Sequence, residues 1–318
     1  TYITHIYNRA FYNCSRLTSV VIGDSVTSIG ERAFWYCTSL TSVVIGDSVT
    51  SIGEYAFFGC SSLTSVNIPN GVTSIGELAF YNCRSLTNVV IGDSVTSIGE
   101  RVFHHCKNLT SVQIGDGVTS IGNYMFKESQ IKEIDLTGVE EILSGAFMKC
   151  NNLQEANLLS CTTICDRAFQ GCTALETVNA PLWVVDDDGP WYNRWDWPVS
   201  AFYECTALET VSVPSLTVLP EDCFYGCTSL KTVKADACGD IEQYCFYGCE
   251  KLEKVYYPGT AEQWGKVSVG YNNSDLSKKI IFECNSDKPY YGGSCGENLV
   301  WKIHVDGTEL IISGTGAM

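Results

Sequence analysis

The segment Ile29–Ile45, IGERAFWYCTSLTSVVI, holds the pattern that decides the fold of this 318-residue chain. Its aromatic residue, Phe34, recurs at nearly constant spacing: five steps of 23 residues are followed by steps of 21, 22, 33, 22 and 22. The recurring residues are Phe11, Phe34, Phe57, Phe80, Phe103, Phe126, Phe147, Phe169, Phe202, Phe224 and Phe246. A fixed period of about 20–50 residues is typical of a solenoid, in which each copy stacks on its neighbours.

Each copy predicts one strand and one return leg. Leu40, Val43 and Ile45 form Leu-x-x-Val-x-Ile, whose last two members alternate as in a strand with one buried face. A Gly-Asp-Ser turn follows, and Val-x-x-Ile then brings the chain back inward. Because a single copy could not bury its apolar side, we expect parallel strands roughly 4.7–4.9 Å apart, in a rod on the order of 50 Å long.

The repeated string Ile-Gly-Glu-x-Ala-Phe-x-x-Cys-x-x-Leu-x-x-Val-x-Ile resembles the BspA-type, or treponemal-type, leucine-rich repeat of bacterial surface proteins. The resemblance covers about Ile3 to Tyr257. It implies an α/β-type leucine-rich-repeat solenoid of about eleven turns, with parallel strands on the concave face. It also implies export, an extracellular or cell-surface location, and binding to a protein partner such as a host or matrix protein.

The sequence divides into three expected parts. The solenoid should span residues 1–257, with an insertion at about 183–198 where one step is longer by about ten residues. Residues 258–284 resemble the cap that often follows such arrays, and Thr260–Gln263 resembles a capping box that opens a short helix. Residues 285–318 are expected to be a linker and a β-hairpin of a truncated following module, so we take the chain as a piece of a longer protein.

The charge balance excludes some partners. The chain has 20 Lys and Arg against 36 Asp and Glu, a net charge of −16, which repels the phosphates of nucleic acid. No run of eighteen apolar residues occurs, so we expect no membrane insertion in this segment.

Ten of the seventeen cysteines follow the repeated phenylalanine by three residues. They are Cys14, Cys37, Cys60, Cys83, Cys106, Cys150, Cys172, Cys205, Cys227 and Cys249. Neighbours in such a column are one strand spacing apart, farther than the usual Cβ–Cβ distance of a disulfide, so free buried thiols are expected. Outside the array, Cys284 and Cys295 either form a disulfide or remain free.

The sequence predicts neither a metal site nor a cofactor. It has no paired Cys-x-x-Cys knuckles, and its four histidines are His5, His104, His105 and His304. The adjacent pair, His104 and His105, is expected at the surface. Catalytic motifs such as Gly-x-Ser-x-Gly or His-Glu-x-x-His are missing from the sequence, so we do not expect an enzyme.

Outward positions of the strands differ between the two halves of the array. Seven residues after the phenylalanine the first five copies all have threonine, and eight residues after it they have serine or asparagine, whereas later copies have varied and charged residues in both columns. Variety favours recognition and uniformity favours a spacer. The ligand-binding candidates from these columns are Glu176, Glu209, Lys231 and Lys254; the alternative is ordinary solvated charge.

The insertion provides the other candidates for ligand binding, since Trp, Tyr and Arg are enriched in binding hot spots. These are Trp183, Asp186, Asp187, Asp188, Trp191, Tyr192, Arg194, Trp195 and Trp197. The tryptophans could contact a protein or stack on a glycan, or they could fold back and plug the solenoid. The three aspartates lack the alternating spacing of a calcium loop.

The leading interpretation is a secreted or cell-surface adhesion or binding protein whose solenoid presents a ligand face. The alternative is a structural stalk that holds another domain away from the cell surface. Near-identical copies of IGDSVTSIGE at Ile22–Glu31, Ile45–Glu54 and Ile91–Glu100 favour the stalk.

Overall fold

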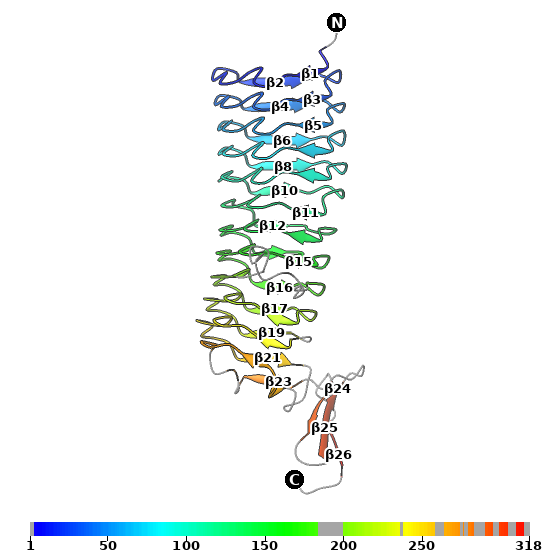
Figure 1. Cartoon of the computed structure of the whole chain (residues 1–318), viewed down its shortest axis with the longest axis vertical. Coiled ribbons are helices and arrows are strands. Elements are labelled where there is room, and N and C mark those ends of the chain that lie inside the picture. The colour runs from blue at the N-terminus through cyan, green and yellow to red at the C-terminus, as the bar shows by residue number, and fades with distance from the viewer. Residues whose placement is uncertain are drawn as a thin grey trace.

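The computed structural model describes residues 3–183, 200–235, 238–257, 264–273, 276, 279–282, 290–294, 299–304 and 310–314, with the backbone alone from residue 281 onward. Coil follows coil along one long axis, from the first residues at one end to the last strands at the other (Figure 1). The coils form a parallel-strand β-solenoid of about ten turns.

One wall, which we call the longer-strand wall, consists of strands of three or four residues, except for β12 (Glu133–Ile134) and β14 (Glu155–Ala156), which have two. These strands are β2 (Ser19–Ile22), β4 (Ser42–Ile45), β6 (Ser65–Ile68), β8 (Asn88–Ile91), β10 (Ser111–Gln113), β12 (Glu133–Ile134), β14 (Glu155–Ala156), β16 (Thr177–Asn179), β17 (Thr210–Ser212), β19 (Thr232–Lys234), β21 (Lys254–Tyr257) and β23 (Ile280–Phe282). Paired neighbours are parallel and in register, so that Ser19 lies beside Ser42 and Ile22 beside Ile45. Equivalent residues therefore form columns along the stack.

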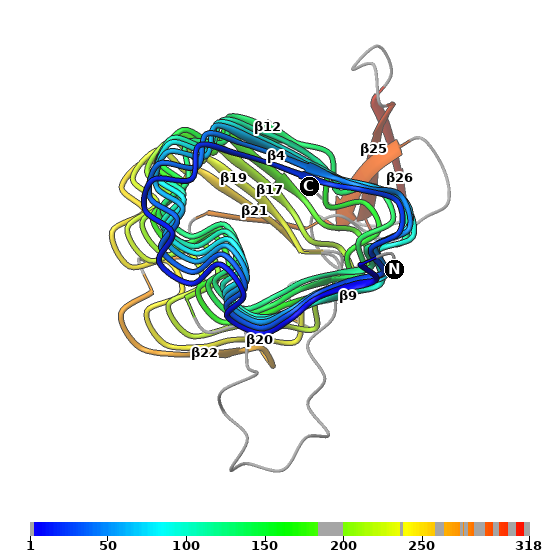
Figure 2. The ribbon, with the colours of Figure 1, turned by 90° about the horizontal axis from the view of Figure 1, so that it is seen from above.

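Short two-residue strands form the opposite wall, as the view down the stack shows (Figure 2). They are β1 (His5–Ile6), β3 (Ser28–Ile29), β5 (Ser51–Ile52), β7 (Ser74–Ile75), β9 (Ser97–Ile98), β11 (Ser120–Ile121), β13 (Glu141–Ile142), β15 (Thr163–Ile164), β18 (Val218–Leu219), β20 (Asp240–Ile241) and β22 (Ser268–Val269). Their inward isoleucines, such as Ile29 and Ile52, are buried, which encloses the core between the two walls.

The repeated phenylalanines form one continuous stack inside the solenoid. Adjacent rings such as Phe34 and Phe57 are nearly parallel with centroids 5.0 Å apart, and the rings from Phe34 to Phe246 are fully buried. Phe11 in the first coil is 42% exposed. Offset stacking of this kind adds to the free energy gained from burial itself.

The cysteine column runs beside the phenylalanine stack and links the coils. Each buried thiol donates a hydrogen bond to the carbonyl of the phenylalanine of the preceding coil, as from Cys60 to Phe34 at 3.2 Å and from Cys227 to Phe202 at 3.2 Å. Disulfides do not occur among the cysteines within the described ranges, and of the ten repeat cysteines Cys14 alone is exposed. The expectation of free buried thiols in this column is confirmed, with Cys14 as the exception.

The helical part of the α/β class is not confirmed, because the described residues contain almost no helix. On the return leg, Arg32 and Tyr36 have φ of 53° and 54°, and later coils repeat this pattern. Two left-handed residues four apart interrupt any helix. The residues between them bond alternately within the coil, from Trp35 N–H to the Arg32 carbonyl, and to the next coil, from Phe34 N–H to the Ala56 carbonyl.

The count of eleven turns is likewise not confirmed, and the proposed capping box at Thr260–Gln263 lies outside the described residues. In the described parts of the chain, no helix has the length and apolar character needed to cross a membrane.

Near the C-terminus, β25 (Leu299–His304) and β26 (Leu310–Gly314) pair antiparallel as the two legs of the expected hairpin. A third strand that was not expected, β24 (Tyr290–Ser294), pairs with β25.

Candidate ligand-binding face

Four neighbouring strands of the longer-strand wall position the charged candidates. Strands β16, β17, β19 and β21 are consecutive in one parallel sheet, with Thr177, Thr210, Thr232 and Lys254 side by side. The inward valines between the outward residues, such as Val211 and Val233, are buried and hold the sheet on the core. We call the outward residues of these strands and the residues just before them the second-half face. They are Glu176, Thr177, Asn179, Glu209, Thr210, Ser212, Lys231, Thr232, Lys234, Glu253, Lys254 and Tyr256.

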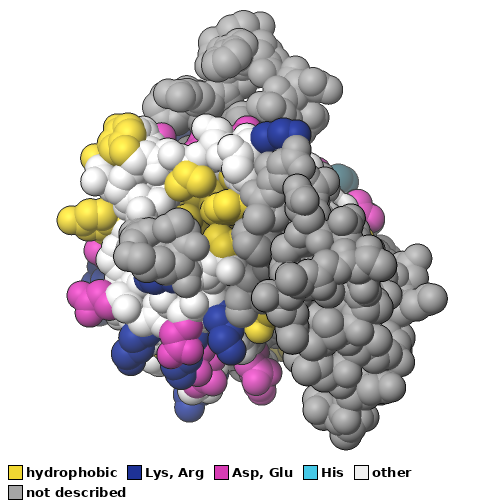
Figure 3. Space-filling model, turned by 90° about the horizontal axis from the view of Figure 1, so that it is seen from below, with side chains coloured by type: hydrophobic (Ala, Val, Ile, Leu, Met, Phe, Trp, Pro, Cys, Tyr) yellow, Lys and Arg dark blue, Asp and Glu magenta, His cyan; other side chains and the backbone are white. Residues whose placement is uncertain are grey.

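Charges of both signs lie close together on the second-half face. Lys231 Nζ lies 2.9 Å from Glu209 Oε1, and this hydrogen bond and charge hold the pKa of Glu209 below its usual value. Lys234 Nζ lies 5.5 Å from the ring centroid of Tyr256. Glu176 and Lys254 are exposed. From the C-terminal end, acidic and basic side chains are intermixed along the lower edge of the molecule (Figure 3).

The equivalent face in the first half has a different hydrogen-bonding state. The hydroxyls of Thr41, Thr64 and Thr87 each donate to the backbone carbonyl of the threonine one coil earlier, at 2.9–3.2 Å. Thr110 continues the ladder with a bond to Thr87. Because these donors are already satisfied inside the protein, the first half offers a ligand fewer free hydrogen-bond donors than the sequence suggests.

Trp183, at the start of the insertion, lies in the core and not on the surface. Trp183 is fully buried and packs edge-on against Phe202, with ring centroids 5.9 Å apart. Of the two alternatives for the tryptophans, Trp183 follows the plug: its indole fills the core where the insertion begins. Asp186, Asp187, Asp188, Trp191, Tyr192, Arg194, Trp195, Trp197, Cys284 and Cys295 lie outside the described residues.

A cluster that sequence reasoning missed lies in the first half, on the turn after Phe103. His104, expected at the surface, is 8% exposed, and neither ring nitrogen has a hydrogen-bond partner among the described residues. Burial, with a smaller electrostatic contribution from the neighbouring His105, lowers the pKa of His104 to about 4. The signal in the sequence was a break in the repeat, since the preceding coil has Tyr81 and Asn82 at these positions.

His105 Nδ1 lies 3.0 Å from Glu128 Oε2 on the next coil, and Lys107 Nζ lies 3.5 Å from the same oxygen. Partial burial raises the pKa of Glu128, but His105 and Lys107 outweigh it and hold the pKa below its usual value. Glu128 is therefore a carboxylate at neutral pH, and the lowered pKa of His104 leaves that ring neutral.

The stacked parallel strands, the buried phenylalanine column and the exposed strand face define a leucine-rich-repeat solenoid. The BspA type leucine rich repeat region matches the chain in six copies, over residues 1–94, 73–185 and 198–287. The chain therefore belongs to the BspA-type leucine-rich-repeat family.

Solved structures of bacterial leucine-rich-repeat proteins are similar along most of the chain. A leucine-rich cell surface protein from Faecalibacterium prausnitzii is 28% identical with a TM-score of 0.51, over 86% of this chain and 87% of that one. A leucine-rich repeat protein from Bacteroides ovatus is 25% identical with a TM-score of 0.60, over 87% of this chain and 82% of that one. No curated protein sequence matches the chain significantly.

Proposed function

We propose that the chain is a non-catalytic binding protein, displayed outside the bacterial cell, that holds a protein partner against its second-half face. The observation that carries this proposal is the contrast between the two halves of one wall. In the first half the threonine donors are satisfied by the backbone, whereas in the second half Glu176 and the Glu209–Lys231 pair are exposed in the same column and Lys254 is exposed in the adjacent one. The similar cell surface protein supports display at the cell surface.

The physical basis for partner binding is a rigid sheet with adaptable charges. The strands β17 and β19 are fixed by the core, so their outward side chains keep a constant spacing from coil to coil. Mixed charges favour specificity and association rate more than affinity, because wrong partners meet like charges. Arg and Lys on the partner would face Glu176 and Glu209, and its carboxylates would face Lys231 and Lys254.

The test compares two charge-matched variants of the full chain. Lys231→Ala/Lys254→Ala removes two positive charges from the second-half face, and Ser42→Glu/Ser65→Glu adds two negative charges to the equivalent column of the first half. Both change the net charge by −2, so long-range electrostatics are the same. Binding would be measured by biolayer interferometry against purified extracellular matrix proteins, with a glycan array in parallel.

We expect at least one matrix protein to bind, at least tenfold weaker to the lysine variant and unchanged with the serine variant. Equal weakening of both variants, or binding to no protein, would contradict the proposal. Binding to glycans alone would replace the protein partner with a carbohydrate.

A second function, as a spacer, is favoured by one observation in the first half. The threonine ladder from Thr41 to Thr110 adds one side-chain hydrogen bond per coil, and both partners of each bond belong to the solenoid itself. A stack of identical, self-satisfied coils is suited to extending the second-half face away from the cell surface.

A further inference from the structure

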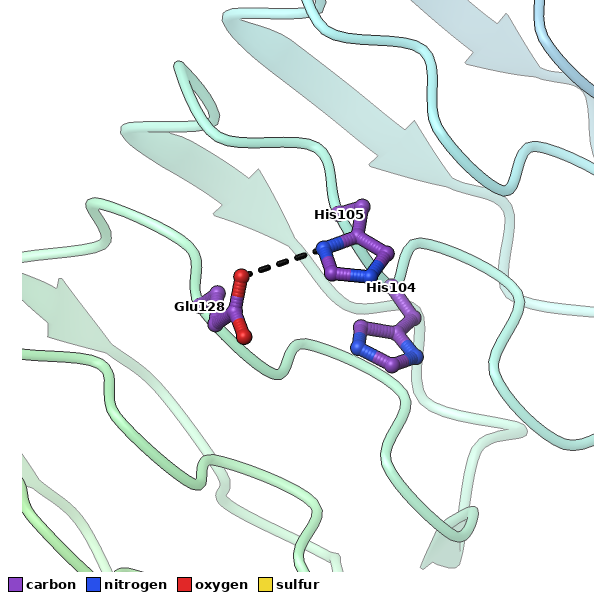
Figure 4. A group of neighbouring side chains, drawn as sticks. All are labelled: His104, His105 and Glu128. Atoms are coloured by element: carbon purple, nitrogen blue, oxygen red, sulfur yellow. Dashed lines mark hydrogen bonds and ion pairs between the residues drawn. The ribbon is translucent and has the colours of Figure 1, made fainter.

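His104, His105 and Glu128 meet across two consecutive coils. His105 and Glu128 occupy the same position of their coils, two residues after Phe103 and Phe126, and so lie one above the other in the stack. His104 precedes His105, and its ring stacks on that of His105 with centroids 4.1 Å apart. One nitrogen of the His104 ring lies on the side that faces Glu128 (Figure 4).

The cluster interrupts an aromatic column. The rings of Tyr12, Trp35, Phe58 and Tyr81 stack one on the next along the coils that precede it. At His104 the column changes from phenyl, phenol and indole rings to imidazole, and the contact with Tyr81 becomes edge-on at 5.3 Å. A phenylalanine would continue the stack without any buried polar atom, so packing alone does not account for a histidine here.

His104 is a buried polar group without a partner. Its two ring nitrogens are buried and make no hydrogen bond with any described residue. An unsatisfied buried nitrogen loses its hydrogen bonds to water without gaining a partner, which destabilises the fold. Among the described residues, the other buried side-chain atoms in this state are Asp166 Oδ1 and Gln170 Oε1. A ligand that accepts the lone pair of one ring nitrogen would give that nitrogen a partner.

We propose that His104, His105 and Glu128 bind one divalent transition-metal ion of the Zn²⁺ class. One ligand atom from each residue lies within 4.8 Å of the other two. Two imidazoles and a carboxylate are a donor set that suits Zn²⁺, and at bond lengths of about 2.0–2.2 Å the ligand atoms would come to roughly 3.3 Å apart. Rotation of three side chains supplies that movement while the backbone stays in place.

The surroundings of the cluster allow an ion to enter from solvent, and they include one group, the Lys107 ammonium, that competes with it for Glu128. His105 and Glu128 have side chains 30% and 27% exposed, so an ion can reach them from solvent and keep water as a fourth ligand. Lys107 competes, because its ammonium contacts the same Glu128 oxygen at 3.5 Å. Its side chain is 57% exposed and can withdraw into water when the metal binds.

The test uses residues that the repeat itself supplies. His104→Phe continues the aromatic column, and His105→Asn and Glu128→Asn copy Asn82, which tolerates the left-handed backbone at that position. His5→Asn is the matched control, since His5 is exposed and far along the stack. Tag-free protein would first be alkylated in its folded state, so that accessible thiols cannot bind metal, and then titrated with Zn²⁺, Mg²⁺ and Ca²⁺ by calorimetry.

We expect the alkylated wild type and His5→Asn to bind one Zn²⁺ per chain and neither Mg²⁺ nor Ca²⁺. Each cluster variant should bind Zn²⁺ at least tenfold more weakly, and Lys107→Met should bind it several-fold more tightly. With Co²⁺, the absorption spectrum should lack a thiolate charge-transfer band. The proposal is overturned if the wild type binds no Zn²⁺, or if His104→Phe and His105→Asn bind it as tightly as the wild type.

Discussion

The first five coils and the last four coils differ on the outside while they share one core. Both halves contain the same stacked phenylalanines and the same thiol-to-carbonyl bonds, as at Cys60 and Cys227. The wall outside them changes from a satisfied threonine ladder to the exposed charges of the second-half face. The inward columns therefore fix the fold, and the outward columns are free to vary for function.

The two halves also differ by one residue per coil, and the structure shows where it is lost. In the first half the turn after β2 includes Gly23, and Val26 N–H bonds to the Gly23 carbonyl. In the second half Leu216 N–H bonds to the carbonyl of Val213, the last inward residue after β17. In both halves the turn closes with a bond from an N–H to the carbonyl three residues earlier. The second-half coil is therefore one residue shorter, while its strand and its return leg are unchanged.

The largest expected effect is alkaline unfolding of both halves together. Burial raises the pKa of Cys37 from 9.0 to about 11 and that of Cys106 and Cys205 to about 12. Above pH 9 the thiols of the unfolded chain lose protons while the folded ones keep theirs, so stability is complete below pH 9 and falls as pH rises toward 12. Chemical denaturation at increasing pH should show this loss.

The matched control for alkaline unfolding is Cys106→Ser/Cys227→Ser, because Ser129 occupies the same buried column. This variant should lose less stability per pH unit than the wild type between pH 9 and 12. Separate alkaline transitions of the two halves, followed by hydrogen exchange, would contradict a shared core.

A smaller effect is expected from opening a cavity in either half. Phe57→Ala and Phe224→Ala each remove a fully buried ring from the same column, and each should cost about 3–5 kcal/mol of unfolding free energy. Guanidinium unfolding would measure the loss, and hydrogen exchange would locate it, since stability in stacked repeats is shared between neighbours. A cost in one half of less than about 1 kcal/mol would show that the cores are not equivalent.

The smallest expected effects on stability are those of single substitutions on the outward surfaces of the two halves. Thr64→Val removes a hydroxyl that donates to the Thr41 carbonyl and should cost about 0.5–1 kcal/mol. Lys231→Ala breaks an ion pair between two side chains that are 43% and 50% exposed, and it should leave the melting temperature unchanged within error. A loss for Lys231→Ala equal to that for Thr64→Val would mean that the second-half face contributes to the fold.

The sequence predicted the stack, the strand register and the thiol column, because Phe34, Cys37 and Ile45 recur at a fixed spacing that only one arrangement buries. It did not predict that the return leg is non-helical. Arg32 and Tyr36 adopt the left-handed backbone conformation, which cannot be inferred from the identity of a residue other than glycine. Bonds to the next coil stabilise it, and such bonds depend on the assembled stack.

The site was harder to predict than the fold. Glu209 and Lys231 were found because columns of outward residues follow directly from the period. For Trp183 the sequence left packing and binding open, because a tryptophan beside an insertion is chemically suited to both. His104 and Glu128 are 24 residues apart, and their proximity follows only when the column positions of adjacent coils are compared.

The direction of the hydrogen bonds in the stack has a mechanical consequence. Bonds between coils, such as those that join β2 to β4, run along the long axis, while the strands themselves lie across it (Figure 1). A pull along that axis would load all the interfaces in series, and each can open without its neighbours, so coils would separate one after another instead of shearing together. If one end were tethered and a partner held the second-half face, the solenoid would lengthen under tension as an extensible spring.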